Sequence, residues 1–127
     1  MEGKVSYPIL EKAEAFALRI VKLYQYLVEK GERVMSKQVL RSGTSIGANV
    51  TEGQYGASRA DFINKYAIAE KEAAETRYWL NLLIRSGYLQ EDDAMRSLVS
   101  DCAELIRLLA ASIKTARKND ARSATTT

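Results

Sequence analysis

The chain has 127 residues, of which 46% are hydrophobic and 28% are charged, and its formal net charge is +3 at pH 7. This length and the low content of glycine and proline, seven and one residues, predict one helical globular domain and exclude disorder over most of the chain. The absence of histidine and the single cysteine, Cys102, exclude imidazole-based catalysis, a histidine zinc site and an intramolecular disulfide.

The first predicted helix begins near Pro8, because proline suits a first helical turn, and it ends at Gly31. Its apolar residues recur at spacings that place them on one face. This stripe consists of Leu10, Ala13, Ala17, Ile20, Tyr24 and Leu27, widened by Phe16 and Leu23. A second helix is predicted from about residue 36 to residues 53–56, with a stripe of Val39, Gly43, Ile46 and Val50.

The second helix contains the stretch RSGTSIGANVTEG, residues 41–53, whose composition is also typical of a phosphate-binding loop. A Walker A loop requires a lysine after its last glycine and a preceding strand, and neither is found here. Two glycines inside a helix each cost about 1 kcal/mol relative to alanine, so a compensating contact is required. We therefore predict that Gly43 and Gly47, beside Ile46 and Val50, let a neighbouring helix approach closely.

Two further helices follow. One is predicted from about residue 58 to 86, with Ser58 and Asp61 resembling a capping box and Gly87 beyond its end. The other follows the acidic run 91–93, which suits a helix N-terminus. Because the connections are short, we expect an all-α, antiparallel, up-down-up-down four-helix bundle over residues 1–117. The polar residues 118–127 are predicted to form a disordered tail.

Polar residues close to the apolar stripes suggest a second feature. Asn49 and Glu52 on the second helix, with Glu75 and Arg77 on the third, would form a buried hydrogen-bonded network that fixes helix register. Ordinary solvated charges explain the same pattern equally well. A catalytic pair of Glu52 and Glu75 is a third, weaker interpretation, and a di-iron site is excluded because it requires histidines.

Basic residues gather in three places. One group, Arg33, Lys37 and Arg41, lies at the start of the second helix, and Arg59 lies at the start of the third. The richest segment runs from Arg107 to Arg122 and contains Lys114, Arg117 and Lys118, opposed only by Asp120. Such residues would bind phosphates without sequence preference, or they would simply complement the dipole of a helix C-terminus.

The stretch QVLRSGTSIGANVTEG, followed by SRADFINKYAIAEKEAAETRYWLNLLIRSGYL, resembles the four-helix-bundle family of 23S rRNA intervening-sequence proteins. The resemblance covers about residues 7–117 and is most specific in the second helix. It depends on Arg41, Ser45, Ile46, Asn49, Glu52 and Gly53, then Phe62, Ile63, Glu72 and Glu75, then Gly87, Tyr88 and Leu89. The turn QYGASRAD departs from the pattern, since many relatives carry a more basic turn.

The resemblance implies a homopentamer with a central channel, because the family is similar to the accessory protein of diversity-generating retroelements. That protein binds nucleic acid and a reverse transcriptase, and no enzymatic activity is established for the family. From the resemblance and the basic groups we expect a non-enzymatic oligomer that binds RNA or DNA without a cofactor or a metal. The alternative is a protein–protein adaptor whose partner is encoded nearby.

Localisation follows from what the sequence lacks. No apolar run approaches the roughly 20 residues that a membrane-spanning helix needs. The N-terminal residues lack the apolar core of a signal peptide. We therefore expect a cytoplasmic protein that does not bind a membrane.

Overall fold

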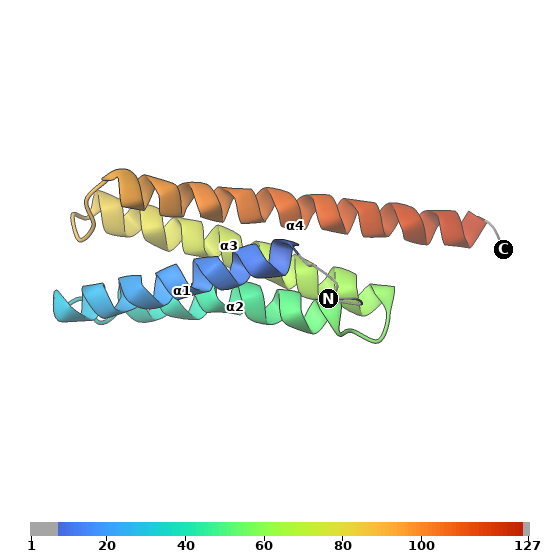
Figure 1. Ribbon diagram of the computed structural model, residues 1–127, viewed down its shortest axis with the longest axis horizontal. Coiled ribbons are helices and arrows are strands. Elements are labelled where there is room, and N and C mark those ends of the chain that lie inside the picture. The colour runs from blue at the N-terminus through green and yellow to red at the C-terminus, as the bar shows by residue number, and fades with distance from the viewer. Residues whose placement is uncertain (1–7, 126–127) are drawn as a thin grey trace, which may run out of the picture.

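The computed structural model describes the backbone of residues 8–125 and the side chains of residues 8–121. This part of the chain forms four helices and no strand. They are α1 (Pro8–Glu29), α2 (Met35–Gln54), α3 (Arg59–Arg85) and α4 (Asp93–Thr125). Each helix contacts the next one, α1 also contacts α4, and within the described range the diagonal pairs stay apart. The expected all-α, four-helix architecture is confirmed (Figure 1).

The helix ends follow local chemistry that the sequence predicted. Gly31 and Gly87 follow α1 and α3 with φ of +89° and +90°, in the left-handed region that favours glycine. Ser58 caps α3, since its hydroxyl accepts a hydrogen bond of 3.1 Å from the N–H of Asp61. Asp92 caps α4 in the same way, accepting from the N–H of Met95 at 2.9 Å.

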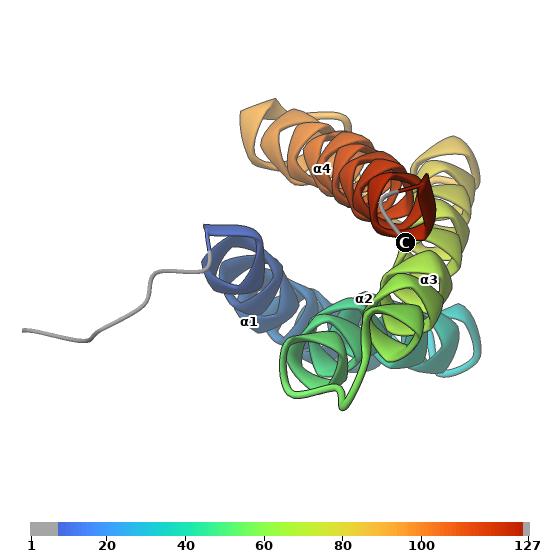
Figure 2. The same ribbon diagram turned by 90° about the vertical axis from the view of Figure 1, so that its right-hand side faces the viewer.

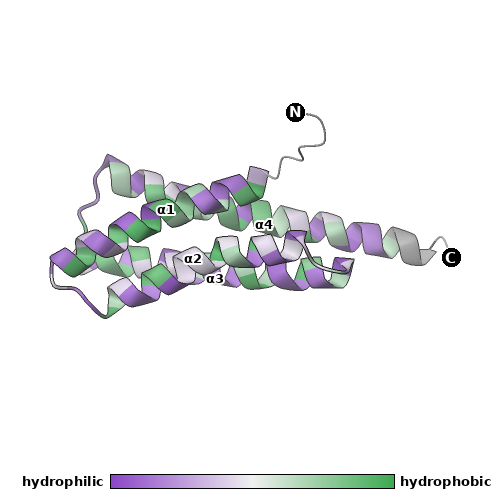
Figure 3. Ribbon diagram, turned by 60° about the horizontal axis from the view of Figure 1, so that its bottom comes forward, coloured by the Kyte–Doolittle hydropathy of each residue, from purple (hydrophilic) through white to green (hydrophobic). Residues whose placement is uncertain are grey.

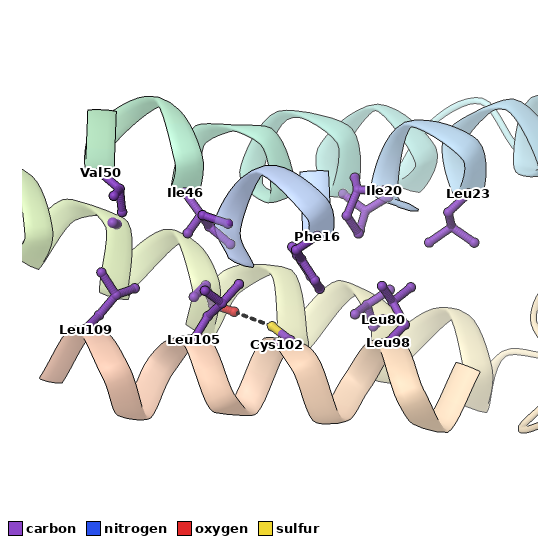
Figure 4. Close-up of a cluster of buried hydrophobic side chains, with 14 of the residues drawn as sticks. Phe16, Ile20, Leu23, Ile46, Val50, Leu80, Leu98, Cys102, Leu105 and Leu109 are labelled. Atoms are coloured by element: carbon purple, nitrogen blue, oxygen red, sulfur yellow. Dashed lines mark hydrogen bonds between the residues drawn. The ribbon is translucent and has the colours of Figure 1, made fainter. Parts of the chain in front are cut away.

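The apolar stripes of the four helices meet in one core (Figure 4). On α1 the buried stripe is rotated slightly from the predicted one. Phe16 and Leu23, predicted at its edge, are buried, whereas Leu10, Ala17 and Tyr24 are only half-buried. The rotation arises because α1 packs against both α2 and α4, so its buried face is centred between these two neighbours.

Glycines on α2 set how closely the neighbouring helices approach. A Cβ atom at Gly43 would lie 2.8 Å from Cγ2 of Ile20, a fully buried residue of α1. A Cβ atom at Gly53 would lie 2.9 Å from the ring of Tyr66 on α3. Real Cβ contacts are essentially never shorter than 3.0 Å, so both positions require glycine in the present packing. The prediction had treated Gly53 only as part of the helix end.

Gly47, unlike Gly43 and Gly53, has room for a Cβ atom. A Cβ atom there would lie 3.7 Å from Ala13, an ordinary van der Waals distance, and Gly47 is half-buried. The other two residues of the predicted packing face, Ile46 and Val50, are fully buried. Close approach on α2 therefore depends on Gly43 and Gly53 and not on Gly47.

The seam between α1 and α4 is the most open of the four, as the end-on view shows (Figure 2). Phe16 points across it from α1 toward α4 (Figure 4). Ion pairs line its outer edge, where Lys12 Nζ lies 2.8 Å from Glu104 Oε1 and Arg19 lies 2.6 Å from Asp101. A large aromatic side chain and exposed ion pairs thus hold the helices together here, instead of close backbone contact.

Helix α4 is longer than the sequence predicted. It continues to Thr125, so residues 118–125 are helical instead of forming the start of a disordered tail. Residues 126–127 of that predicted tail, and the side chain of Arg122, lie outside the described residues. The final turns of α4 extend past the ends of the other helices (Figure 1) and are rich in hydrophilic residues (Figure 3).

None of the four helices, as far as they are described, combines the length and the apolar character needed to cross a membrane.

Candidate nucleic-acid interface

The predicted basic residues of α4 line a shallow groove between α3 and α4. Lys114, Arg117 and Lys118 are spaced three and four residues apart, which places them on one face of the helix. All three are exposed, and Glu70 is the residue that α3 contributes to the lining. The groove has a volume of about 450 Å³, and its remaining lining consists of Ala110, Ile113 and Ala121.

These three cations are not neutralised by the protein's own acids. Among the side chains at 8–121, no carboxylate oxygen lies within 4.0 Å of the charged nitrogens of Lys114, Arg117 or Lys118. Glu70 likewise forms no ion pair in that range, although it is half-buried and shares the groove with them. The groove therefore offers three free positive charges and one free negative charge.

Arg41 and Arg59 differ from this group because each is already paired. The Arg41 guanidinium lies 3.2 Å from Glu72 and also binds Glu75. The Arg59 guanidinium lies 3.1 Å from Asp120 on α4. A phosphate would have to compete with these carboxylates, so neither arginine offers a free charge.

The remaining two predicted residues lie elsewhere. Arg33 and Lys37 are exposed around the start of α2, at the end of the bundle opposite to the C-terminus of α4 (Figure 1). The seven predicted basic residues therefore do not converge on one surface. Only Lys114, Arg117 and Lys118 form a compact group.

A larger groove, of about 760 Å³, lies near the start of α3 and the last turns of α4. Its lining is mostly small and uncharged, and its one charged residue is Arg59, which Asp120 neutralises. Examples of this lining are Ala57, Ala111, Ser112 and Thr115. The larger groove thus offers an ionic ligand fewer free charges than the basic groove, which is the one lined by Lys114, Arg117 and Lys118.

The predicted polar network is not formed. Asn49 donates to the carbonyl oxygen of Ser45 at 2.9 Å, within its own helix. Glu52 instead lies 3.1 Å from Lys65, and Arg77 is exposed. The prediction was wrong because helical spacing gives the face of a residue but does not select its partner among several nearby charges.

Glu75 belongs to a different cluster, which joins α2 to α3. Its Oε2 accepts a hydrogen bond of 2.9 Å from the indole N–H of Trp79 and also binds Arg41. The Tyr78 ring packs edge-on against Trp79, with centroids 5.0 Å apart. Lys65, the partner of Glu52, lies ten residues before Glu75 on α3, or about 15 Å along the helix axis. Glu52 and Glu75 therefore do not form a carboxylate pair.

Glu32 is an important residue that the sequence analysis missed. It is 6% exposed and accepts hydrogen bonds from the N–H groups of Val34, Met35 and Ser36 at 3.2, 3.1 and 2.6 Å. Burial raises the pKa of Glu32, but the three donors outweigh burial and hold the pKa below its usual value. Glu32 therefore stabilises the N-terminus of α2, a role that a carboxylate four residues before Ser36 could have signalled.

Cys102 lies in the core, as predicted, and its thiol has low reactivity. Its thiol donates a hydrogen bond of 3.2 Å to the carbonyl oxygen of Ala73 (Figure 4). Burial raises the pKa of the Cys102 thiol to about 11, and the reactive thiolate is therefore scarce at neutral pH. Within the described part of the chain, no group of three or more Cys, Asp and Glu side chains could hold a metal ion.

Comparison with known proteins identifies the family. The family model described as 23S rRNA-intervening sequence protein matches residues 6–111. The chain belongs to this family. A solved structure from Bacteroides thetaiotaomicron, described as a protein of unknown function from the S23 ribosomal protein family, is 54% identical with a TM-score of 0.81. The match covers 84% of this chain and 98% of that one. No functionally curated protein matches the sequence.

The boundary of the family match bears on the candidate interface. The 23S rRNA-intervening sequence match ends at residue 111, within α4. Lys114, Arg117 and Lys118 all lie after this point, whereas the α2 motif lies inside it. The basic face of α4 therefore lies outside the part of the chain that the family match covers.

Proposed function

We propose that this protein is a non-enzymatic, homo-oligomeric helical bundle that binds nucleic acid through the basic groove of α4. The observation that carries the proposal is the contrast in pairing between the two classes of cation. Arg41 and Arg59 are neutralised by carboxylates, whereas Lys114, Arg117 and Lys118 are exposed and unpaired. The family's name, which refers to an intervening sequence of 23S rRNA, supports RNA as the ligand.

The expected binding chemistry is electrostatic. Cations that contact phosphates release condensed counterions, and the affinity therefore falls steeply as salt rises. The three side chains lie on one helical face, so they are able to follow one stretch of nucleic-acid backbone. Phosphate contacts of this kind carry little sequence preference by themselves.

Oligomerisation would turn one modest patch into a multivalent surface. Repeating the groove in each subunit raises the effective concentration for the second and later contacts. Exposed apolar side chains on α1 support a protein contact there, since Leu18 is 61% exposed and Val21 lies three residues further along the helix. We propose the homopentamer that the family resemblance implies, with a mass about five times 14.2 kDa. Light scattering that gave the mass of one chain would contradict this part of the proposal.

A gel-shift titration with a 23S rRNA fragment tests the proposed ligand. The variant carrying Lys114→Ala, Arg117→Ala and Lys118→Ala should bind at least about tenfold more weakly at low salt. A matched control carries Lys22→Ala, Lys30→Ala and Arg85→Ala, which remove the same charge from other surfaces. An equal loss of RNA affinity in both variants would show that only the net charge of the protein matters. No binding of RNA by the wild-type protein would contradict the proposal.

One observation favours the adaptor alternative. Tyr78 is 58% exposed and lies against Trp79, whose hydrogen-bond partner Glu75 also binds Arg41. Tyrosine, tryptophan and arginine are the residues that most often dominate the energy of protein interfaces. If the adaptor interpretation holds, a pull-down should recover one protein partner, Tyr78→Ala should abolish that recovery, and RNA should not compete.

A further inference from the structure

Glu70 is the feature of the basic groove that phosphate binding alone leaves unexplained. It lines the groove from α3, together with Lys114, Arg117 and Lys118 from α4, and it is half-buried. Three cations are available in the same groove, yet none is within 4.0 Å of its carboxylate. The groove of about 450 Å³ is therefore bounded by opposite charges that do not neutralise each other.

This arrangement orients any nucleic acid that enters the groove. Phosphates are attracted to the α4 wall and repelled from the carboxylate on the α3 wall. A strand that lays its backbone along Lys114, Arg117 and Lys118 is able to present a base to Glu70, which lines the same groove. A carboxylate is purely a hydrogen-bond acceptor, and it recognises bases through their N–H donors.

The chemistry of the bases then sets a preference. Cytosine, adenine and guanine carry an exocyclic amino group that donates to a carboxylate, whereas uracil and thymine carry carbonyl oxygens at those edges. In an RNA duplex the amino groups take part in base pairing and the remaining donors of cytosine and adenine lie in a deep, narrow major groove, but in a single strand these edges are free to be read. The volume of the groove, about 450 Å³, is in the range of pockets that hold small molecules, about 300–1,000 Å³, so a single unpaired base fits inside it.

We infer that the α3–α4 groove binds single-stranded nucleic acid and that Glu70 makes it favour amino-bearing bases over uracil and thymine. This inference rests on the proposed function, since it requires that phosphates bind Lys114, Arg117 and Lys118. Glu70 acts here as a specificity residue, while the three cations supply the affinity.

Fluorescence anisotropy with labelled RNA hexamers tests the inference. The wild-type protein should bind the adenine and cytosine hexamers about fivefold or more tightly than the uracil hexamer, and all three more tightly than a hairpin duplex. Glu70→Gln should raise every affinity, because it removes a negative charge facing the ligand. The same change should lower the ratio of the affinities for the cytosine and uracil hexamers to near one. The reason is that the glutamine amide also donates hydrogen bonds to the carbonyl oxygens of uracil.

Glu72→Gln is the matched control, because Glu72 is also a half-buried glutamate of α3 but pairs with Arg41 outside the groove. It changes the net charge equally and should leave the base preference intact. Equal affinity for all hexamers in the wild type, a ratio unchanged by Glu70→Gln, or stronger duplex binding would overturn the inference and leave the proposed function standing. No binding of any RNA would instead overturn the proposed function.

Discussion

The middle of α2 and the C-terminal half of α4 are opposites in composition and in structure. The α2 stretch has the more distinctive sequence, with closely spaced glycines, serines and threonines, and its Gly43 is buried against Ile20. The C-terminal half of α4 has an unremarkable mixture of alanine, lysine and arginine, and Lys114, Arg117 and Lys118 are exposed along its groove with α3. One region is built for contact within the protein, and the other is free to contact a ligand.

The difference teaches that an unusual motif need not mark a binding site. Small residues on α2 are required because another helix occupies the space where side chains would otherwise lie. The cations on α4 matter because no carboxylate among the side chains of residues 8–121 pairs with them. This property depends on their surroundings and not on their spacing. The family match ends between the two regions, at residue 111, so the packing motif belongs to the shared fold and the cations lie outside it.

Gly43→Val breaks the α2 side of this comparison and has the largest expected effect on stability. The new Cβ would lie 2.8 Å from Cγ2 of Ile20, a fully buried and conformationally stiff side chain. Overpacking of this kind typically lowers the free energy of unfolding by about 1–3 kcal/mol. Urea denaturation followed by circular dichroism measures the change, and an unaltered midpoint would show that α1 is able to move away from α2 easily.

Glu32→Gln should lower stability by about 1–2 kcal/mol at pH 7, because a neutral amide is a weaker acceptor for the three N–H groups of α2. The pKa of Glu32 is lower in the folded protein than in the unfolded chain. Its stabilising effect is therefore complete above the unfolded value, about 4.5, and is lost as pH falls through the folded pKa. Thermal melts from pH 3 to 7 measure this pH dependence of stability, which Glu32→Gln should remove. The control, Glu29→Gln, alters an exposed side chain and should keep it.

Gly47→Ala sharpens the comparison within α2, because the sign of its effect should be opposite to that of Gly43→Val. The added methyl group would meet Ala13 at an ordinary 3.7 Å. Removing glycine from a helix interior then stabilises the protein by about 0.5–1 kcal/mol. A lower melting temperature in this variant would mean that Gly47 also faces a close contact, for example in an oligomer.

Arg19→Ala tests the open seam between α1 and α4, where we expect the smallest effect. Arg19 binds Asp101 at 2.6 Å and the carbonyl oxygen of Ala94 at 3.0 Å. Both ends of this ion pair are solvated, so the loss should be about 0.2–1 kcal/mol and should shrink at high salt. A loss independent of salt would show that packing of the arginine stem, and not its charge, holds the seam.

The sequence predicted the helices well because their signals are local. Apolar spacing identified four helices, and the cap at Ser58 and the left-handed turns at Gly31 and Gly87 were found where residue chemistry required them. The end of α4 was predicted too early, because a polar helix that extends beyond its neighbours shows no apolar stripe. Glu32 was missed because it lies in the connection before α2, where the apolar spacing that identified the helices carries no information.

The candidate site was less predictable because it depends on pairing. Lys114, Arg117 and Lys118 were grouped correctly on one helical face, but the sequence placed Arg41 and Arg59 in the same class. Their carboxylate partners, Glu72 and Asp120, lie 31 and 61 residues away along the chain, so only the fold reveals that these charges are satisfied. The presence of Glu70 in the same groove as the α4 cations likewise depends on how α3 packs against α4.

The salt dependence of RNA binding tests the central claim most directly, namely that the free cations of α4 bind phosphates. The slope of log affinity against log salt should be about three units shallower per binding site when Lys114, Arg117 and Lys118 are replaced by alanine, since each phosphate contact contributes about one unit. The variant without Lys22, Lys30 and Arg85 should keep the wild-type slope. Identical slopes in the wild type and the α4 variant would contradict the account.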